Sequence, residues 1–233
     1  MTIRLYDLVG SDETRPFSPH CWKVRMALDH KGLPYEVVLK TFVEVKTIEN
    51  GTDRTIPVIR DGDNVIHDSF AIAEYLDDAY PDRPTLFGGP EGRALSRFIE
   101  AWSLRALHAP IVGIALMDVY EMQDETNREH FRRTREARFK KPLEEVQTGT
   151  QAEREAALNA GIEPLRATLL RQAFLGGEAP IFADFIVFGA LQWLRVCSAS
   201  WPFQPGDPVA DWFERCLDLN GGAARSVPAA RAA

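Results

Sequence analysis

The chain has 233 residues, 45% of them hydrophobic and 26% charged, and its formal net charge is −7 at pH 7. These values are ordinary for a globular protein, and the length suits one large domain or two small ones. The acidic balance argues against nucleic-acid binding, because that function needs a concentrated basic face. The most basic run, at 128–141, contains two glutamates at helical spacing and is interpreted as a solvated helix face.

Cysteine usage and hydropathy argue against further classes of protein. The three cysteines, Cys21, Cys197 and Cys216, are odd in number and widely spaced, which predicts neither a disulfide framework nor a zinc site. A reducing, cytoplasmic location is therefore expected. The first ten residues lack the apolar core of an export signal, and no run approaches the about 18 apolar residues of a membrane span.

The first 80 residues alternate between strand and helix signals. β-Formers at 3–9 and 35–40 predict strands, and a helical apolar period at 18–33 ends at Lys31 and Gly32. The turn DGD between IPVI and NVI predicts a hairpin, and 69–80 predicts a second helix. The expected order is β-α-β-loop-β-β-α, with a loop or short helix at 41–54.

A Pro/Gly-rich linker at 83–91 separates this part from a helical part. Helical patterns follow at 91–121, 124–147, 151–173, 182–197 and 207–219. The sequence thus predicts an α/β domain at 1–82 and an all-helical domain at 92–222. The low-complexity end, 223–233, is expected to be a flexible tail.

Three short motifs occur in the first part: SPHCWKVR from Ser18, Ile56-Pro57, and Asp68-Ser69. Together with the order of elements, they resemble the glutathione S-transferase superfamily of the serine type. The resemblance covers nearly the whole chain and implies a thioredoxin-like first domain and a homodimer. Within the superfamily, the long stretch LVGSDETRPF and the segment ADFIVFGALQW are similar to bacterial lignin β-etherases and related fungal transferases.

The resemblance assigns a role to each motif. It places Ser18 at the catalytic serine and implies a cis bond between Ile56 and Pro57, with the backbone of Ile56 binding the cysteinyl part of glutathione like an added strand. Asp68 would bind the α-amino group of the γ-glutamyl end. Ser69, at a helix N-terminus, would bind the α-carboxylate. A family capping box is half present, with Asp184 in place and Ile181 where Ser or Thr is usual.

Ser18 has a structural and a chemical interpretation. Ser followed by Pro is an ordinary helix start. As the family's catalytic serine, its hydroxyl would donate a hydrogen bond to the glutathione sulfur. That bond, with the helix N-terminus, favours the thiolate over a thiol whose pKa is near 8.5. Lowering that pKa by about 1.5 units needs about 2 kcal/mol, which a charge-assisted hydrogen bond and a helix terminus supply.

Other roles are expected by position. The glycyl carboxylate of glutathione needs a cation, for which Lys40, Lys46 and Arg54 are candidates, and Thr55 adjoins the backbone clamp. The resemblance places a hydrophobic electrophile pocket between the domains, for an aromatic-sized substrate, with Pro110 kinking a helix that shapes it. Its candidate residues are Val9, Gly10, Trp102, Met117, Tyr120 and Trp201, with Phe203 beside the last.

The expected function is glutathione transfer of the detoxification type, with glutathione as co-substrate and no metal. An etherase version would displace an aryloxide from an aromatic ether. Two alternatives stay open: a non-catalytic glutathione carrier, and a thiol–disulfide reductase using Cys21. Cys21 lies one turn inside the helix, where a buried small hydrophobe is favoured. His20 is expected to be a surface histidine.

Overall fold

A computed structural model describes residues 2–49, 51 and 55–230 of the chain. A four-stranded sheet has the order β2-β1-β3-β4, formed by Ile3–Leu8 (β1), Tyr35–Lys40 (β2), Val58–Asp61 (β3) and Asn64–His67 (β4). β1 and β2 are parallel, whereas β3 is antiparallel to β1 and to β4. The predicted hairpin is confirmed, with Gly62 at a positive φ of 58° in its turn.

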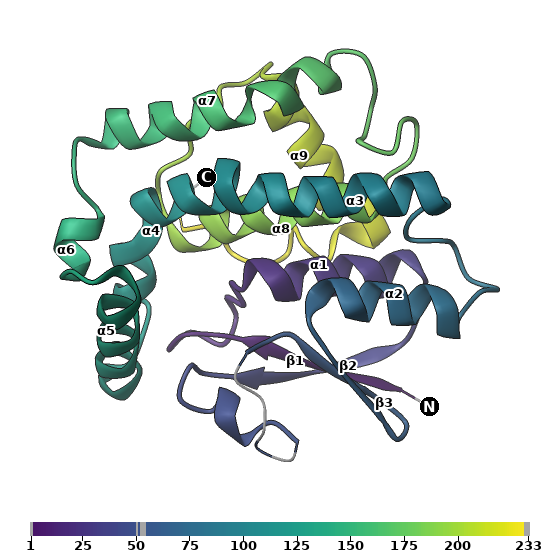
Figure 1. Ribbon diagram of the computed structural model, residues 1–233, viewed down its shortest axis with the longest axis horizontal. Helices are drawn as coiled ribbons and strands as arrows, with labels where there is room; N and C mark the ends of the chain where they lie inside the picture. The colour runs from purple at the N-terminus through teal and green to yellow at the C-terminus, as the bar shows by residue number, and fades with distance from the viewer. Residues whose placement is uncertain (1, 50, 52–54, 231–233) are drawn as a thin grey trace.

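Helices α1 (Pro19–His30) and α2 (Ser69–Ala79) lie on one side of the sheet, between it and the remaining helices (Figure 1). The short 3-10 helix η1 (Val45–Thr47) lies in the loop after β2, as the sequence allowed. The apolar side of α1, including Val24, Ala27 and Leu28, is fully buried. The predicted thioredoxin-like first domain, followed by an all-helical domain, is confirmed.

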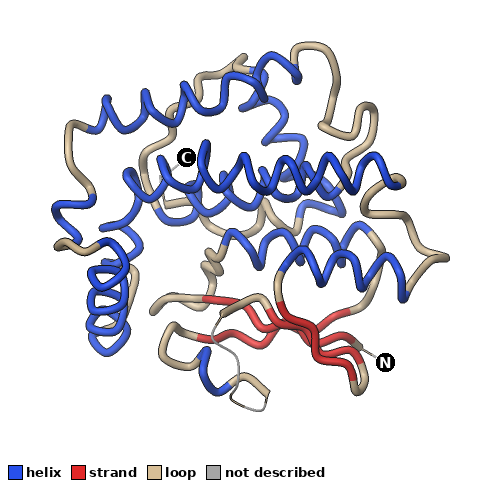
Figure 2. Tube along the Cα trace, in the orientation of Figure 1, coloured by secondary structure: helices blue, strands red, loops and turns tan. Residues whose placement is uncertain are grey.

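The helical part begins at α3 (Pro90–Ser103), and the other elements are the π-helical turn η2 (Leu104–His108), α4 (Ala109–Glu121), α5 (Glu125–Phe139), α6 (Leu143–Val146), α7 (Gln151–Leu169), α8 (Phe182–Cys197), α9 (Pro208–Asp218) and the 3-10 helix η3 (Leu219–Gly222). Figure 2 shows their arrangement beside the sheet. The predicted helices broadly match, with two interruptions.

The first interruption divides the predicted helix at 91–121. Pro110 has no N–H to offer the carbonyl of Ala106 four residues earlier, and the π-helical turn occurs there. α7 packs closely on this turn, because a Cβ at Gly161 would lie 2.4 Å from the Ala106 oxygen. The second interruption divides 124–147, where Lys140 takes a left-handed conformation (φ 62°) ahead of Pro142.

α8 is the centre of the core, and Phe182, Phe185 and Phe188 are all fully buried. Its N-terminus lacks a Ser or Thr cap, as expected from Ile181. Asp184 compensates by accepting hydrogen bonds from the backbone N–H groups of Leu175 (2.7 Å), Gly176 (3.2 Å) and Ile181 (3.0 Å), and from Nε1 of Trp212 (3.0 Å). One buried carboxylate therefore joins the loop before α8 to α9.

The expectation of a flexible tail is wrong for residues 223–230. Ala224 and Val227 are buried, and their carbonyls accept hydrogen bonds from Gln192 (3.0 Å) and Arg195 (2.9 Å) of α8. The N–H of Ala230 donates to the Arg195 carbonyl at 2.9 Å. Small apolar residues of low complexity are here packing residues, because the polar side chains of α8 satisfy their backbone.

We expect Asp184→Ala to lower the free energy of unfolding by about 3 kcal/mol, since it leaves several buried donors without an acceptor. Equilibrium urea denaturation measures this loss. The exposed Glu178, in the loop before α8, is the matched control, and Glu178→Ala should change stability by less than about 0.5 kcal/mol. Equal effects of the two variants would contradict the structural role of Asp184.

Candidate functional site

Ser18 caps the start of α1. Its backbone is extended (φ −61°, ψ 121°), Pro19 follows at the first helical position, and the Ser18 side chain is buried. Its Oγ accepts the backbone N–H of Cys21 at 3.3 Å. A hydroxyl oxygen that accepts one hydrogen bond still has its own hydrogen to donate. The capping role of Ser18 is thus confirmed, and its hydroxyl hydrogen also interacts with the Cys21 thiol.

A close contact with α8 fixes this first turn of α1. A Cβ at Gly189 would lie 2.2 Å from the carbonyl oxygen of Pro19 and 3.3 Å from Cγ of Lys23. Only glycine permits that approach, since even an alanine methyl would collide with backbone. On the other side, the N–H of Phe17 donates to the carbonyl of Leu8 at 3.1 Å. Ser18 is therefore held between the end of β1 and α8.

The sheet register brings the other two motifs to the same edge. The Ile56–Pro57 bond is cis, as the resemblance implied. β3 begins one residue later, at Val58, which is paired with Tyr6 of β1 and with His67 of β4. Pro57 therefore lies opposite Asp7 on one side and Asp68 on the other. Ile56 precedes the ladder of β3, so its backbone lies outside that pairing.

Asp68 caps α2 in a conformation unusual for a residue other than glycine (φ 71°). Its Oδ1 accepts the N–H groups of Phe70 (2.9 Å) and Ala71 (3.0 Å). The Asp68 side chain is exposed, whereas Ser69 is buried. Backbone strain of this kind costs about 1–3 kcal/mol and concentrates at ligand sites. An exposed carboxylate at a helix N-terminus here suits a bound ammonium group.

Glu49 fixes the loop that leads to Ile56. Its carboxylate accepts hydrogen bonds from the hydroxyl of Tyr6 on β1 and from the guanidinium of Arg60 on β3, the latter at 2.8 Å through Nε. These bonds, Arg60 foremost, lower the pKa of Glu49 to about 2. No local pattern in the sequence marks this anchor, because its partners Tyr6 and Arg60 are 43 and 11 residues away along the chain.

The candidate cations have different settings. Lys40 is the last residue of β2 and is partly buried, and its carbonyl accepts the N–H of Val9 at 2.9 Å. Lys46, on η1, is exposed, and so is Thr55. Arg54 lies outside the described residues. Lys40, at the end of β2, and Thr55, in the loop before β3, thus flank the end of the sheet where the three motifs meet.

The residues predicted for an electrophile pocket pack in separate groups. Val9 and Gly10 are buried, and a Cβ at Gly10 would lie 2.4 Å from the Met122 carbonyl at the end of α4. The guanidinium of Arg132 lies 4.8 Å from the Tyr120 ring centroid. Trp201 packs on Phe203 and Phe213, with ring centroids 5.1 and 4.9 Å away. Trp102 and Met117 are partly buried against the core.

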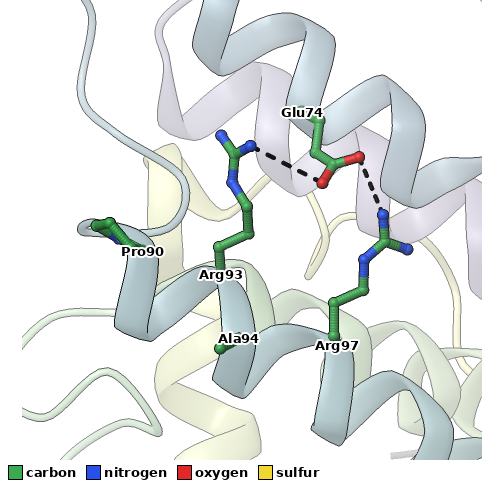
Figure 3. A pocket seen from close by; sticks show the side chains of 5 residues that line it. All are labelled: Glu74, Pro90, Arg93, Ala94 and Arg97. Atoms are coloured by element: carbon green, nitrogen blue, oxygen red, sulfur yellow. Dashed lines mark hydrogen bonds and ion pairs between the residues drawn. The ribbon is translucent and has the colours of Figure 1, made fainter.

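A pocket of about 390 Å³ lies elsewhere, between α2 and α3 (Figure 3). Glu74, Pro90, Arg93, Ala94 and Arg97 line it. Nη1 of Arg93 and Nη2 of Arg97 approach the two oxygens of Glu74 at 3.9 and 3.0 Å. None of the predicted site residues lines this pocket, and its two arginines share an acidic partner.

Comparisons with known proteins agree with this geometry. Residues 14–84 match the family model "Glutathione S-transferase, N-terminal domain", and residues 94–216 match the model "Glutathione S-transferase, C-terminal domain". The chain belongs to the glutathione S-transferase family. The glutathione S-transferase-like protein ustS of Aspergillus flavus is 28% identical over 211 residues, which cover 77% of this chain and 75% of that protein.

Two solved fungal transferases are similar in structure. A glutathione S-transferase of Ceriporiopsis subvermispora, in complex with glutathione, has a TM-score of 0.82 and 27% identity, with 94% of this chain and 96% of that one covered. The glutathione transferase GSTFuA3 of Phanerochaete chrysosporium has a TM-score of 0.75 and 28% identity, with 95% and 92% covered. Both similarities extend over the two domains of this transferase.

Cys21 is fully buried, as predicted for a small hydrophobe. Burial raises the pKa of its thiol well above the ordinary value, and neighbouring Asp7 acts in the same direction. Its Sγ lies 3.7 Å from the carbonyl oxygen of Tyr6. At neutral pH this cysteine is therefore a protonated, inaccessible thiol, which is a poor nucleophile.

The expectation that His20 lies on the surface is wrong. Its ring stacks on that of His108, at the end of the π-helical turn, with centroids 5.2 Å apart and planes at 21°. His108 in turn lies 5.9 Å from Trp193 of α8. Burial lowers the pKa of His20 well below its ordinary value and that of His108 to about 3. Both rings are neutral at pH 7 and belong to the contact between the domains.

Sequence reasoning also missed an aromatic row next to Ser18. Phe17 lies 5.9 Å from Phe42, and Phe42 lies 5.3 Å from Phe131 of α5, between ring centroids. Only the fold brings these three together, because each comes from a different segment.

Among the described residues, no group of three or more His, Cys, Asp or Glu side chains is arranged to hold a metal ion, and no helix is long and apolar enough to cross a membrane.

We expect Glu49→Gln to destabilise the protein at pH 7 and to have progressively less effect as the pH falls. The pKa of Glu49 is about 4.3 when unfolded and lowered in the fold, so its stabilisation is complete above about pH 5. It is lost as the pH falls towards 2. Urea unfolding of both proteins between pH 7 and 3 measures the difference.

The control is Glu36→Gln, which breaks an exposed ion pair with Arg4 and should have little effect at any of these pH values. A stability difference between wild type and Glu49→Gln that stays constant from pH 7 to 3 would contradict the assigned role of Glu49.

Proposed function

We propose that this chain is a glutathione transferase in which Ser18 stabilises the thiolate of bound glutathione. The observation that carries the proposal is the setting of Ser18, a buried hydroxyl at a helix N-terminus whose oxygen already accepts the Cys21 N–H at 3.3 Å. Its hydrogen, which interacts with the Cys21 thiol here, is the group that would donate to the glutathione sulfur. The glutathione-bound transferase of Ceriporiopsis subvermispora supports a glutathione site in this chain.

The other motifs define how glutathione would lie. The backbone of Ile56, before the cis bond to Pro57, would pair with the cysteinyl residue as an added strand. Asp68 would bind the α-amino group, and Ser69 with the start of α2 would bind the α-carboxylate. Lys40, Thr55 and Arg54 are the candidates for the glycyl end. This orientation places the sulfur towards Ser18, because the three motifs share one edge of the sheet.

The reaction is nucleophilic attack by the thiolate on a hydrophobic, aromatic electrophile. The thiol proton leaves to solvent, the sulfur forms a bond to carbon, and the leaving group departs with its electron pair. In ether cleavage that leaving group is an aryloxide, which then takes up a proton. The proposal includes β-aryl ethers as substrates, on the resemblance of LVGSDETRPF and ADFIVFGALQW to the β-etherase branch. A homodimer is part of the same proposal.

The two rival functions make different demands. A thiol–disulfide reductase would need Cys21 as nucleophile, and its complete burial and raised pKa disfavour that role. A non-catalytic carrier would bind glutathione without favouring its thiolate. Thiolate absorbance near 240 nm in the glutathione complex separates the carrier from the enzyme.

We expect Ser18→Ala to lower turnover about 30-fold with glutathione affinity mostly kept, since the lost stabilisation of the thiolate is about 2 kcal/mol. Steady-state kinetics with an aryl ether or an aromatic halide measure turnover, and the 240 nm absorbance of the complex measures the thiolate. Cys21→Ala should retain near-normal turnover.

Ser18→Ala also removes a helix cap, which costs about 1 kcal/mol of stability. Thr150→Ala removes the cap of α7 and is the control for that loss. It should lower stability to a similar extent and leave turnover unchanged. Equal turnover in wild type and Ser18→Ala would return Ser18 to a capping role only.

We expect Asp68→Asn to weaken glutathione binding about tenfold, since it removes the charge that would pair with the α-amino group. Asparagine is as good a helix cap as aspartate, so the stability of the protein should change little. Calorimetric titration with glutathione measures the affinity. The exposed Asp63, in the β3–β4 turn, is the control, and Asp63→Asn should bind normally. Unchanged binding by Asp68→Asn would contradict the assigned contact.

A further inference from the structure

Arg135 of α5 lies beside two neighbouring aromatic rings. Its guanidinium carbon lies 4.8 Å from the ring centroid of Phe42 and 4.6 Å from that of Phe131. The side chain is partly buried. Aromatic faces attract a guanidinium and fix its plane, so this planar group has a defined orientation.

This guanidinium has no acidic partner among the described residues. In the part of the chain that the structure describes, no carboxylate lies within ion-pair distance of Arg135, and Nη1 donates to Thr134 Oγ1 at 3.0 Å. The nearby acids Glu136 and Glu144 pair with Arg132 instead, at 2.9 and 2.8 Å. A guanidinium carries five N–H donors, so most of those of Arg135 remain for a ligand.

The surroundings of Arg135 are positively charged in an acidic protein. Arg138, three residues further along α5, is exposed and acts on Arg135 through its charge. Burial, and then the charge of Arg138, lower the pKa of Arg135 to about 10. The guanidinium is therefore still charged at pH 7. Its burial and the nearby positive charge make the charged form less favourable, and a bound anion would offset that effect.

Arg135 is connected to the transferase site through two rings. Phe42 contacts Arg135 on one side and Phe17 on the other, and Phe17 immediately precedes Ser18. Phe42 also follows Lys40 closely, and the N–H of Val43 donates to Asn127 of α5 at 3.0 Å. Figures 1 and 2 show α5 beside the loops that follow β1 and β2. Phe17 is itself buried, so a molecule bound near Ser18 would reach this guanidinium along the half-buried ring of Phe42.

We propose that Arg135 binds a carboxylate of a substrate of the transferase reaction. Two carboxylates have the required chemistry: the glycyl carboxylate of glutathione, and an acidic group on an aromatic electrophile that contacts Phe42. The planar fork of the guanidinium matches either group bidentately. This inference rests on the proposed function. It adds a charged group that recognises a carboxylate to a site that the sequence predicted to be apolar.

The test uses Arg135→Gln in the full chain, with two pairs of probes. The first pair is glutathione and its glycyl monoethyl ester, titrated calorimetrically. The second pair is 4-fluoro-3-nitrobenzoate and the neutral 4-fluoro-3-nitrobenzamide, compared by KM. In this reaction the glutathione sulfur forms a bond to the ring carbon, the carbon–fluorine bond breaks, and fluoride leaves.

If the glycyl carboxylate binds, Arg135→Gln weakens glutathione about tenfold and leaves the ester unchanged. If the electrophile binds, the variant raises KM for the benzoate about tenfold and leaves that for the benzamide unchanged. Either result supports the inference and identifies the source of the carboxylate. Arg135→Lys keeps the charge without the fork, so it should fall between wild type and Arg135→Gln, and it serves if the glutamine variant does not fold.

The matched control is Arg133→Gln, which removes an exposed guanidinium from the same helix and should change each value less than twofold. Equal effects of Arg135→Gln on the acid and neutral probes of both pairs, or no effect on any, would overturn the inference. That failure is distinct from failure of the proposed function, in which the wild type itself binds no glutathione and does not release fluoride from the benzamide.

Discussion

The approach of α1 to α8 determines where the candidate chemistry lies. At Gly189 the two helices are so close that a single methyl group would collide with the Pro19 carbonyl, at 2.2 Å. Ser18 immediately precedes Pro19 in the chain. The position of the Ser18 hydroxyl therefore depends on a glycine in the other domain. α8 is fixed in turn by Asp184 and its four hydrogen bonds. The register of β3 with β1 and β4 then places Ile56, Pro57 and Asp68 at the same end of the sheet.

Backbone conformations that are unusual for residues other than glycine occur around this edge. Glu49 and Asp68 both have positive φ values, 49° and 71°, without being glycine. The two flank the Ile56–Pro57 segment in the chain, and each carboxylate accepts several hydrogen bonds. Their side-chain bonds offset the backbone cost, and these polar contacts act together with the burial of Val45 and Ile48 in the loop after β2. That leaves the edge accessible to a polar peptide such as glutathione.

The sequence predicted what depends on local spacing. Ser18-Pro19, the DGD hairpin and Asp68 at a helix start are each defined within a few residues, and the structure has them in those settings. The surface assignment of His20 was wrong because its stacking partner, His108, lies on a π-helical turn in the other domain. The row of Phe17, Phe42 and Phe131 was missed for the same reason. An apolar period shows that a side chain is buried and does not show which distant segment covers it.

The packed chain end has a practical and an evolutionary consequence. Residues 223–230 accept hydrogen bonds from the side chains of Gln192 and Arg195 on α8. Gly189 of the same helix contacts the first turn of α1. Changes at the end of the chain are therefore transmitted to the helix that supports Ser18, although they are distant in sequence. A purification tag is better attached at the other terminus. Relatives with longer or shorter ends would be expected to differ in catalytic behaviour even where every site motif is the same.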